Sequence, residues 1–377
     1  MKKTFYSKGF LANALTLLLS VALLPSCSDN DEPDNGGKNP DPVAVSYGAY
    51  VLNQGQDYAQ VEGSLTYINP ADNFSVKNNV FTNVNKRSLG TTPQCGVRYG
   101  SKVYLGICDS STIEIIDATS FKSLKQIKLD AATTGTSPRG MAIDNGKVYV
   151  TMFDGYVARL DTASLEIDGR VQVGPNPETP AIFNGKLFVP NSDGLNHAVG
   201  YGETASIINL ATFTVESTVK VPLNPNKFLA TDHNLYLLTK GNYFDIEGAI
   251  YEIDPSIADM QKEDKGDGYK LIAEATSFAA FGDELIYLNT PYTNSTLRYY
   301  AKYDINSGKI TTWNAPEVIY PNELNVDPLS GDIYVASYYM NGQYPSYILP
   351  GFVAIYDKSF TFKKKCEVGS GPSCIFF

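Results

Sequence analysis

A short apolar strand with a central aromatic residue recurs along this chain, and the repetition constrains the fold more than any other feature. The recurrences are Ala49-Tyr50-Val51-Leu52, Val103-Tyr104-Leu105, Val148-Tyr149-Val150, Leu187-Phe188-Val189, Leu235-Tyr236-Leu237, Ile286-Tyr287-Leu288 and Ile333-Tyr334-Val335. Their central aromatic residues lie 39 to 54 positions apart. A period of about 40 to 50 residues is the size of one four-stranded propeller blade. Seven such units therefore predict an all-β, seven-bladed β-propeller over residues 47–377.

Two further features recur in each unit. The strand that follows the aromatic strand in each unit ends in Asp or Asn, at Asp117, Asp161, Asn209, Asp254, Asp304 and Asp357. A Pro-containing turn then precedes the strand that opens the next unit, at Pro93, Pro138, Pro180, Pro225, Pro321 and Pro372. This layout resembles the YVTN/YncE-like propeller repeat, and the resemblance covers about residues 47 to 377.

The two ends of the repeat array predict how the ring closes. The array starts at the second strand of a blade, around Tyr50, and finishes with an isolated first strand over residues 373–377. Pairing these two segments removes two open sheet edges, so we expect the C-terminal strand to complete the first blade. An open seven-unit solenoid is the alternative.

The N-terminal segment has the pattern of an export signal. Three lysines precede an apolar stretch over residues 10–24, which is too short for a spanning helix. Leu24-Pro25-Ser26-Cys27 resembles a bacterial lipobox, which implies a signal peptide over residues 1–26 and lipidation of Cys27. Residues 27–46 are rich in Asp, Asn, Gly and Pro and are predicted to form a flexible acidic tether. The acidic cluster resembles a surface-export signal, so we expect an outer-membrane lipoprotein that faces outward, with plain secretion as the alternative.

The loops between the second and third strands of the units differ in length. They are short in units two and three and long in the other five, and they share one face with the Pro-containing turns. The long loops are rich in tyrosine, which offers a large rigid contact area and a hydroxyl. The candidate ligand-binding residues are Tyr58, His197, Tyr201, Tyr243, Phe244, Tyr292, Tyr338, Tyr339, Tyr344 and Tyr347. The alternative is that these tyrosines pack on one another and stiffen the loops.

Residue patterns for catalysis or metal binding are missing from the sequence. There are only 2 histidines, His197 and His233, and no metal-protease, hydrolase or P-loop motif. His233 lies in a predicted turn away from the loop face. The run Lys262 to Asp267 is predicted to be a solvated turn at the rim, with a calcium site as the weaker alternative. We therefore predict no catalytic residues, no metal site and no cofactor.

The net charge limits the possible partners, and the cysteine content limits the possible disulfides. The net charge of −10 disfavours nucleic acid as a partner. Besides Cys27 there are Cys95, Cys108, Cys366 and Cys374. Cys95 and Cys374 follow the Pro turns of neighbouring units and are expected to face the central channel. Free buried thiols are expected, and disulfides stay open as the alternative in an exported protein.

The opening residues carry a second resemblance. Residues 50–55, Tyr-Val-Leu-Asn-Gln-Gly, followed by residues 63–67, Gly-Ser-Leu-Thr-Tyr, look like the start of a group of surface lipoprotein propellers typified by the cobalamin-capturing BtuG-type proteins. The resemblance implies a non-enzymatic receptor that captures a corrinoid such as vitamin B12 and passes it to a TonB-dependent outer-membrane transporter. It carries over no ligand-contacting residue. A module that docks on a protein or glycan without a small ligand is one alternative, and an enzyme on the same scaffold is another.

Overall fold

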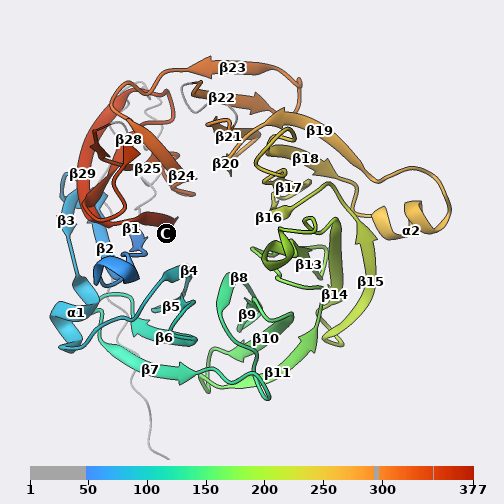
Figure 1. Cartoon of the computed structure of the whole chain (residues 1–377), viewed down its shortest axis with the longest axis horizontal. Helices are drawn as coiled ribbons and strands as arrows, with labels where there is room; N and C mark the ends of the chain where they lie inside the picture. Colours follow the sequence, from blue (N-terminus) through green and yellow to red (C-terminus); the bar gives the residue numbers. More distant parts are fainter. Residues whose placement is uncertain (1–47, 293–296, 343) are drawn as a thin grey trace, which may run out of the picture. The chain divides into compact units, whose positions relative to one another are not determined.

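The computed structural model describes residues 48–292, 297–342 and 344–377. These residues form seven four-stranded antiparallel sheets and one two-stranded hairpin. Figure 1 shows the sheets as blades around a common axis, with one strand of each blade at the centre. The all-β, seven-bladed propeller predicted from the repeats is confirmed. The predicted signal peptide over 1–26 and the predicted lipidated Cys27 and tether over 27–46 lie outside the described residues.

The first four blades take their strands in chain order, except that the innermost strand of the first blade comes from the C-terminus. The first blade consists of β30 (Pro372–Phe376), β1 (Ala49–Asn53), β2 (Ser64–Asn69) and β3 (Ser75–Lys77). The second consists of β4 (Pro93–Tyr99), β5 (Lys102–Ile107), β6 (Thr112–Asp117) and β7 (Ser123–Lys128). The third consists of β8 (Pro138–Asp144), β9 (Lys147–Met152), β10 (Tyr156–Asp161) and β11 (Ile167–Gln172). The fourth consists of β12 (Ala181–Phe183), β13 (Lys186–Asn191), β14 (Thr204–Asn209) and β15 (Thr214–Lys220).

The last three blades continue this order, and the seventh carries the extra hairpin. The fifth blade consists of β16 (Pro225–Ala230), β17 (Leu235–Thr239), β18 (Ala249–Ile253) and β19 (Tyr269–Glu274). The sixth consists of β20 (Ser277–Phe281), β21 (Glu284–Asn289), β22 (Tyr299–Asp304) and β23 (Ile310–Trp313). The seventh consists of β24 (Tyr320–Val326), β25 (Ile333–Tyr338), β28 (Pro350–Tyr356) and β29 (Phe362–Ser370), with β26 (Met340–Asn341) and β27 (Tyr344–Pro345) as the hairpin.

Helices are few in the described residues. The α-helices are α1 (Val80–Asn85) and α2 (Ile257–Lys262), and three short 3₁₀ turns span Asp57–Ala59, Pro70–Asp72 and Gly194–Asn196. Across the described part of the chain, no helix is long and apolar enough to cross a membrane. Helix α2 leads directly into the charged run predicted as a rim turn, and residues 262–267 are exposed as expected.

Burial follows the position of a strand within its blade. Neighbouring sheets cover both faces of the second strand, so in β5 every residue from Val103 to Ile107 is buried. The outermost strand has solvent on one side, and β7 accordingly alternates between half-buried and exposed residues. The recurring apolar strand of the sequence is the second strand of each blade. Its central aromatic residue is buried in the core, as at Tyr104 and Tyr149.

The C-terminal strand closes the ring. Strand β30 pairs antiparallel with β1, and Tyr50 lies opposite Phe376 while Val51 lies opposite Ile375. The rings of Tyr50 and Phe376 stack with their centroids 5.2 Å apart. The predicted pairing of residues 373–377 with the strand around Tyr50 is confirmed, and the open solenoid is excluded.

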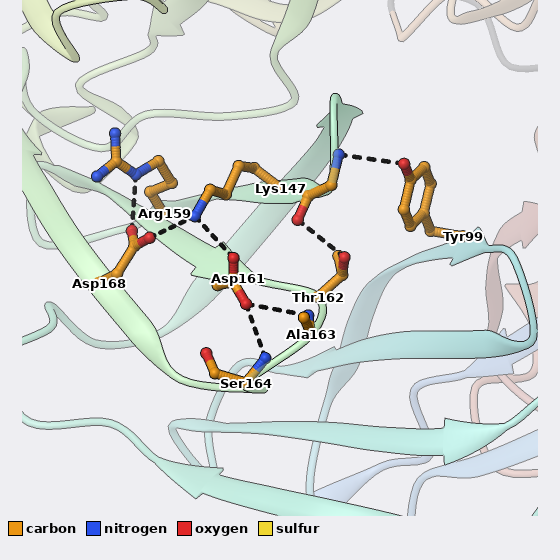
Figure 2. Close-up of polar contacts among 9 residues, drawn as sticks. Tyr99, Lys147, Arg159, Asp161, Thr162, Ala163, Ser164 and Asp168 are labelled. Atoms are coloured by element: carbon orange, nitrogen blue, oxygen red, sulfur yellow. Dashed lines mark hydrogen bonds and ion pairs between the residues drawn. The ribbon is translucent and has the colours of Figure 1, made fainter. Parts of the chain in front are cut away.

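The two faces of the ring carry different connections. One face, here called the loop face, holds the loops between second and third strands together with the connections between blades. The opposite face, called the turn face, holds short turns such as the one after Asp161. That carboxylate accepts hydrogen bonds from the backbone N–H groups of Ala163 at 3.0 Å and Ser164 at 2.7 Å (Figure 2). Asp254 and Asp304 hold their own turns in the same way, as the sequence predicts.

Ion pairs brace the turn face further. Lys147 Nζ lies 2.8 Å from Asp161 and 2.5 Å from Asp168, and Arg159 Nε lies 2.6 Å from Asp168 (Figure 2). The hydroxyl of Tyr99, from the preceding blade, accepts a hydrogen bond from the Gly146 N–H at 3.1 Å. These contacts tie the ends of three strands together and link two blades.

Candidate binding site

The innermost strands enclose a polar cavity at the centre of the ring. This cavity, called the funnel, has a volume of about 520 Å³. Each innermost strand borders the axis of the ring and starts at the loop face. Residues near the start of these strands therefore line the cavity at its loop-face end. The polar side chains that line the funnel are Gln54, Gln94, Arg139, Glu178, Thr179, Asn226, Lys227, Lys240, Asn322, Glu323, Asn325 and Ser373. Apart from the buried Glu178, these side chains are half-buried, and such a group of polar side chains around a cavity is typical of a binding site rather than of a packed core.

Two ion pairs join residues of different blades along the wall of the funnel. Arg139 donates to Glu178 through Nε at 3.1 Å and through Nη2 at 2.9 Å. Glu178 is only 7% exposed, and burial raises the pKa of its carboxyl group while Arg139 opposes the shift. In the second pair, Lys227 Nζ lies 3.5 Å from Glu323 and also donates to the Phe278 carbonyl at 3.1 Å.

A third cation, Lys240, has no carboxylate partner among the described residues. It follows directly after β17, and its Nζ donates to the backbone carbonyl of Thr276 at 2.7 Å. Burial lowers the pKa of its ammonium group, and the more distant Glu323 opposes that shift. The funnel is thus lined by three cations and two carboxylates, and a third carboxylate, Glu247, lines the adjoining cavity of about 420 Å³ together with Lys240.

Amide side chains are fixed around the same cavity. Gln54 donates to the Gln94 carboxamide oxygen at 2.8 Å, which joins the first and second blades. Asn322 and Asn325 donate to the carbonyls of Pro372 and Ile375 at 2.8 and 2.7 Å. Asn322 and Asn325 thus hold the closing strand, and the Asn325 side-chain oxygen also accepts a hydrogen bond from the Val326 N–H at 2.9 Å.

Two side cavities adjoin the funnel. One, of about 250 Å³, extends toward the fourth blade and is lined by Phe153, Leu195, His197 and Tyr201. The other, of about 420 Å³, extends toward the sixth blade and is lined by Thr290, Pro291, Tyr292 and Tyr320. Lys240 and Tyr243 line all three cavities. The fifth-blade loop is thus the centre of the candidate site.

The Asn242 side chain holds much of that loop in shape, and Asn224 adds a bond to the Gly241 carbonyl at 2.9 Å. The side-chain oxygen of Asn242 accepts from the N–H groups of Phe244, Asp245 and Ile246 at 2.9 to 3.0 Å. Tyr243 takes a positive φ of 58°, which is uncommon for a bulky residue and which the Asn242 bonds stabilise. The loop conformation places the Tyr243 ring between the cavities.

Five of the predicted tyrosines, together with Tyr320, form two arcs on the loop face. In the first arc, Tyr243 makes edge-on contacts with Tyr201 at 5.8 Å and with Tyr292 at 5.6 Å between ring centroids. In the second, Tyr338 contacts Tyr347 at 5.1 Å and Tyr320 at 6.3 Å. The tyrosines therefore do pack on one another, and Tyr243, Tyr292 and Tyr338 also line a cavity.

The remaining predicted residues lie in different surroundings. Tyr58, Phe244 and Tyr344 are each more than two-thirds exposed and line none of the three cavities, while His197 lines the smallest one. Tyr339 packs on the Phe352 ring at 4.8 Å and donates from its hydroxyl to Glu367 at 3.3 Å, so it braces the outer strands of the seventh blade.

Sequence reasoning missed the charged lining of the funnel. Arg139, Lys227 and Glu323 lie one or two positions after Pro138, Pro225 and Pro321. The signal was present in the repeats, because the turn prolines mark the start of each innermost strand. Aligning the units on these prolines places the three charges toward one axis.

The cysteines and histidines take up mostly passive positions. Cys95, Cys108, Cys366 and Cys374 are free thiols, and Cys95 and Cys374 line the funnel as expected. Burial raises the pKa of Cys374 to about 12, so the thiol is protonated and unreactive. His233 lies at a separate turn-face cavity of about 450 Å³, which confirms its predicted place away from the loop face. Within the described ranges, no three metal-binding side chains gather.

Fold and site together define the class: a seven-bladed β-propeller with its adjoining cavities on the loop face. The chain belongs to the family described as "Domain of unknown function (DUF5074)", which matches residues 47–370. No curated protein matches the chain in sequence.

Solved structures share the fold at low identity. The hydrazine synthase of Kuenenia stuttgartiensis is 13% identical with a TM-score of 0.53, and the match covers 74% of this chain and 86% of that one. Apo AztD from Citrobacter koseri is 10% identical with a TM-score of 0.54, and the match covers 87% of this chain and 97% of that one. At such identities the likeness shows the fold alone.

Proposed function

We propose that this protein is a non-enzymatic surface receptor that captures a corrinoid, such as vitamin B12, on the loop face. The observation that carries the proposal is the group of three adjoining cavities around Lys240 and Tyr243. Their lining combines amides, charges and tyrosine rings. Such a mixed lining suits a large amphiphilic ligand rather than a small polar one.

The chemistry of a corrinoid matches this lining. Its macrocycle is broad and apolar on its faces, and its edge carries carboxamide side chains. Tyr243 and Tyr292 offer ring surface to the macrocycle, while Gln94, Asn226 and Asn322 offer amide donors and acceptors to the edge. A propeller ring supplies the rigid support that keeps such a surface pre-organised.

The proposal includes an anchor and a partner. The lipobox ending at Cys27 would hold the protein in the outer membrane, on the outer side, through its lipid alone. From there the receptor would pass its ligand to a TonB-dependent transporter. The lipobox, the acidic tether and the resemblance of residues 50–55 to the BtuG-type group support this part.

Titration calorimetry tests ligand capture directly. The soluble protein from residue 36 keeps every strand of the ring, and it is titrated with cyanocobalamin. We expect saturable binding with a dissociation constant of about 1 μM or lower, equivalent to about 8 kcal/mol. The matched control is Tyr243→Ala, which should bind more weakly. Absence of wild-type binding at micromolar concentration would remove the corrinoid proposal.

A second function is favoured by the apolar side chains at the edge of the loop face. Tyr58, Leu195, Val199, Phe244 and Tyr344 are all more than two-thirds exposed. Exposed apolar groups beside a cavity are typical of docking surfaces for a protein or glycan. A pull-down in which a transporter co-purifies with the protein independently of added corrinoid would favour this function.

A further inference from the structure

Lys240 differs from the other two cations of the funnel in its partners. Arg139 and Lys227 each face a carboxylate, but Lys240 Nζ bonds only to the Thr276 carbonyl among the described residues. An ammonium group has three N–H donors, so two remain free for the cavity. Removing a charge from water without a counter-charge costs free energy, and burial accordingly lowers the pKa of this ammonium group.

Two neutral groups in the same cavities also lack hydrogen-bond partners. The Thr290 hydroxyl lines the cavity of about 420 Å³ and has no partner in the described part of the chain. The Asn226 carboxamide lines the funnel and the cavity of about 250 Å³, and its side chain forms no hydrogen bond with another described residue. Lys240 lines all three cavities and so borders both groups.

We infer that Lys240 is an anion subsite whose ammonium group binds a phosphate or carboxylate of the ligand, with Asn226 and Thr290 as neutral donors beside it. The inference deepens the proposed function and rests on it for the choice of probes. A charged oxygen at this place would pair with the Lys240 ammonium group and form charge-assisted hydrogen bonds, and it would have to compete with the Glu247 carboxylate that lines the same cavity. Burial lowers the pKa of the Lys240 ammonium group, and a bound anion would oppose that shift.

Two corrinoids that differ in their phosphate distinguish binding at this subsite from binding at the rest of the surface. Cyanocobalamin carries a phosphodiester in its nucleotide loop, whereas dicyanocobinamide lacks both the phosphate and the nucleotide. The protein from residue 36 is titrated with each corrinoid as wild type, as Lys240→Met and as Lys240→Arg. The matched control is Lys186→Met, which removes a turn-face lysine paired with Glu216 at 2.9 Å.

We expect Lys240→Met to weaken cyanocobalamin binding by about tenfold and dicyanocobinamide binding by less than about twofold. Lys240→Arg should retain most of the affinity for cyanocobalamin, and Lys186→Met should change neither titration. Equal losses for the two corrinoids, or no loss for cyanocobalamin, would overturn the anion subsite and leave the corrinoid proposal standing.

If neither corrinoid binds, the proposed function is removed, but the anion subsite is still tested by a second measurement. Thermal unfolding is compared in about 20 mM phosphate and in chloride of equal ionic strength, since a bound anion raises the unfolding temperature. Stabilisation of the wild type by phosphate that Lys240→Met abolishes would support the anion subsite. The same response in both proteins would overturn it.

Discussion

The turn face and the loop face of this ring treat charge in different ways. On the turn face, Lys147 lies between Asp161 and Asp168, and Asp161 also caps its own turn. On the loop face, Lys240 lines three cavities, and its Nζ donates to the Thr276 backbone carbonyl with no carboxylate partner among the described residues. Both faces use ion pairs to hold strands together, but among the described residues Lys240 on the loop face has no carboxylate within ion-pair distance.

The largest effect is expected from a substitution in the closing strand β30, which supports both faces of the ring. Phe376→Ala removes a buried ring that stacks on Tyr50 at the closing strand. Loss of a buried Phe side chain leaves a cavity, and we expect the free energy of unfolding to fall by about 3–5 kcal/mol. Urea denaturation followed by circular dichroism measures the change.

The exposed rim residue Phe244 is the control for that experiment. Phe244→Ala should change the free energy of unfolding by less than about 0.5 kcal/mol, because its ring is solvent-exposed. A loss as large as that of Phe376→Ala would mean that the rim is part of the core, and the comparison of the two faces would fail.

A smaller effect is expected inside the funnel from Arg139→Met. This change leaves the buried Glu178 carboxylate unpaired, at a cost of about 3 kcal/mol in the free energy of unfolding. Burial already raises the pKa of Glu178, and removing Arg139 removes a group that opposes the shift. A carboxyl group with a raised folded pKa destabilises the fold when ionised, so the loss is full at high pH and shrinks as pH falls through that pKa.

Urea denaturation at about pH 8 and about pH 5 measures this pH dependence. The double variant Arg139→Met with Glu178→Gln removes the charge and should recover most of the loss at the higher pH. An equal loss at both pH values, unchanged by the second substitution, would contradict the role given to the pair.

The next prediction compares two tyrosines of the loop face by their effect on ligand affinity. Tyr243→Ala removes a ring that lines all three cavities, so we expect cyanocobalamin affinity to fall by about tenfold. Tyr339→Ala removes a ring that packs on Phe352, so affinity should change by less than about twofold while stability falls. Calorimetric titration of both variants would contradict this division if the two affinities fell alike.

The smallest effect belongs to the turn face. Lys147→Met removes two surface ion pairs, and we expect a loss of less than about 1 kcal/mol in the free energy of unfolding. Because salt screens exposed charges, the loss should shrink further at about 1 M NaCl, and ligand affinity should not change. A change in affinity would show that the two faces are coupled.

Particular residues show how far the sequence predicted this structure. The spacing of Tyr50, Tyr104 and Tyr149 predicted the blades because a buried second strand needs an uninterrupted apolar run. The isolated segment over residues 373–377 predicted the closing strand because an unpaired edge is costly. Both results follow from local patterns that repeat along the chain.

The candidate site depends on more than the loops. Tyr243, Tyr292 and Tyr338 lie beside cavities on the face where loop length and composition predicted a tyrosine-rich surface, and their role in ligand binding stays a prediction. Tyr339 was expected beside them, but it follows Tyr338 on the chain and points to the outer strands instead. Which way a side chain leaves a loop depends on neighbours such as Phe352, which the sequence of the loop does not contain.

The sequence by itself determined the number of blades, the closing strand and the face that carries the long loops, because each depends on periodicity or on the edges of strands. Only the tertiary structure decided that Arg139 pairs with Glu178 and Lys227 with Glu323 beside one funnel, and that Lys240 has no carboxylate partner among the described residues. The two partners of each ion pair come from different blades, and their distances depend on how seven sheets pack around one axis. Electrostatic interactions fall off with distance, so the properties of the site were set by that packing.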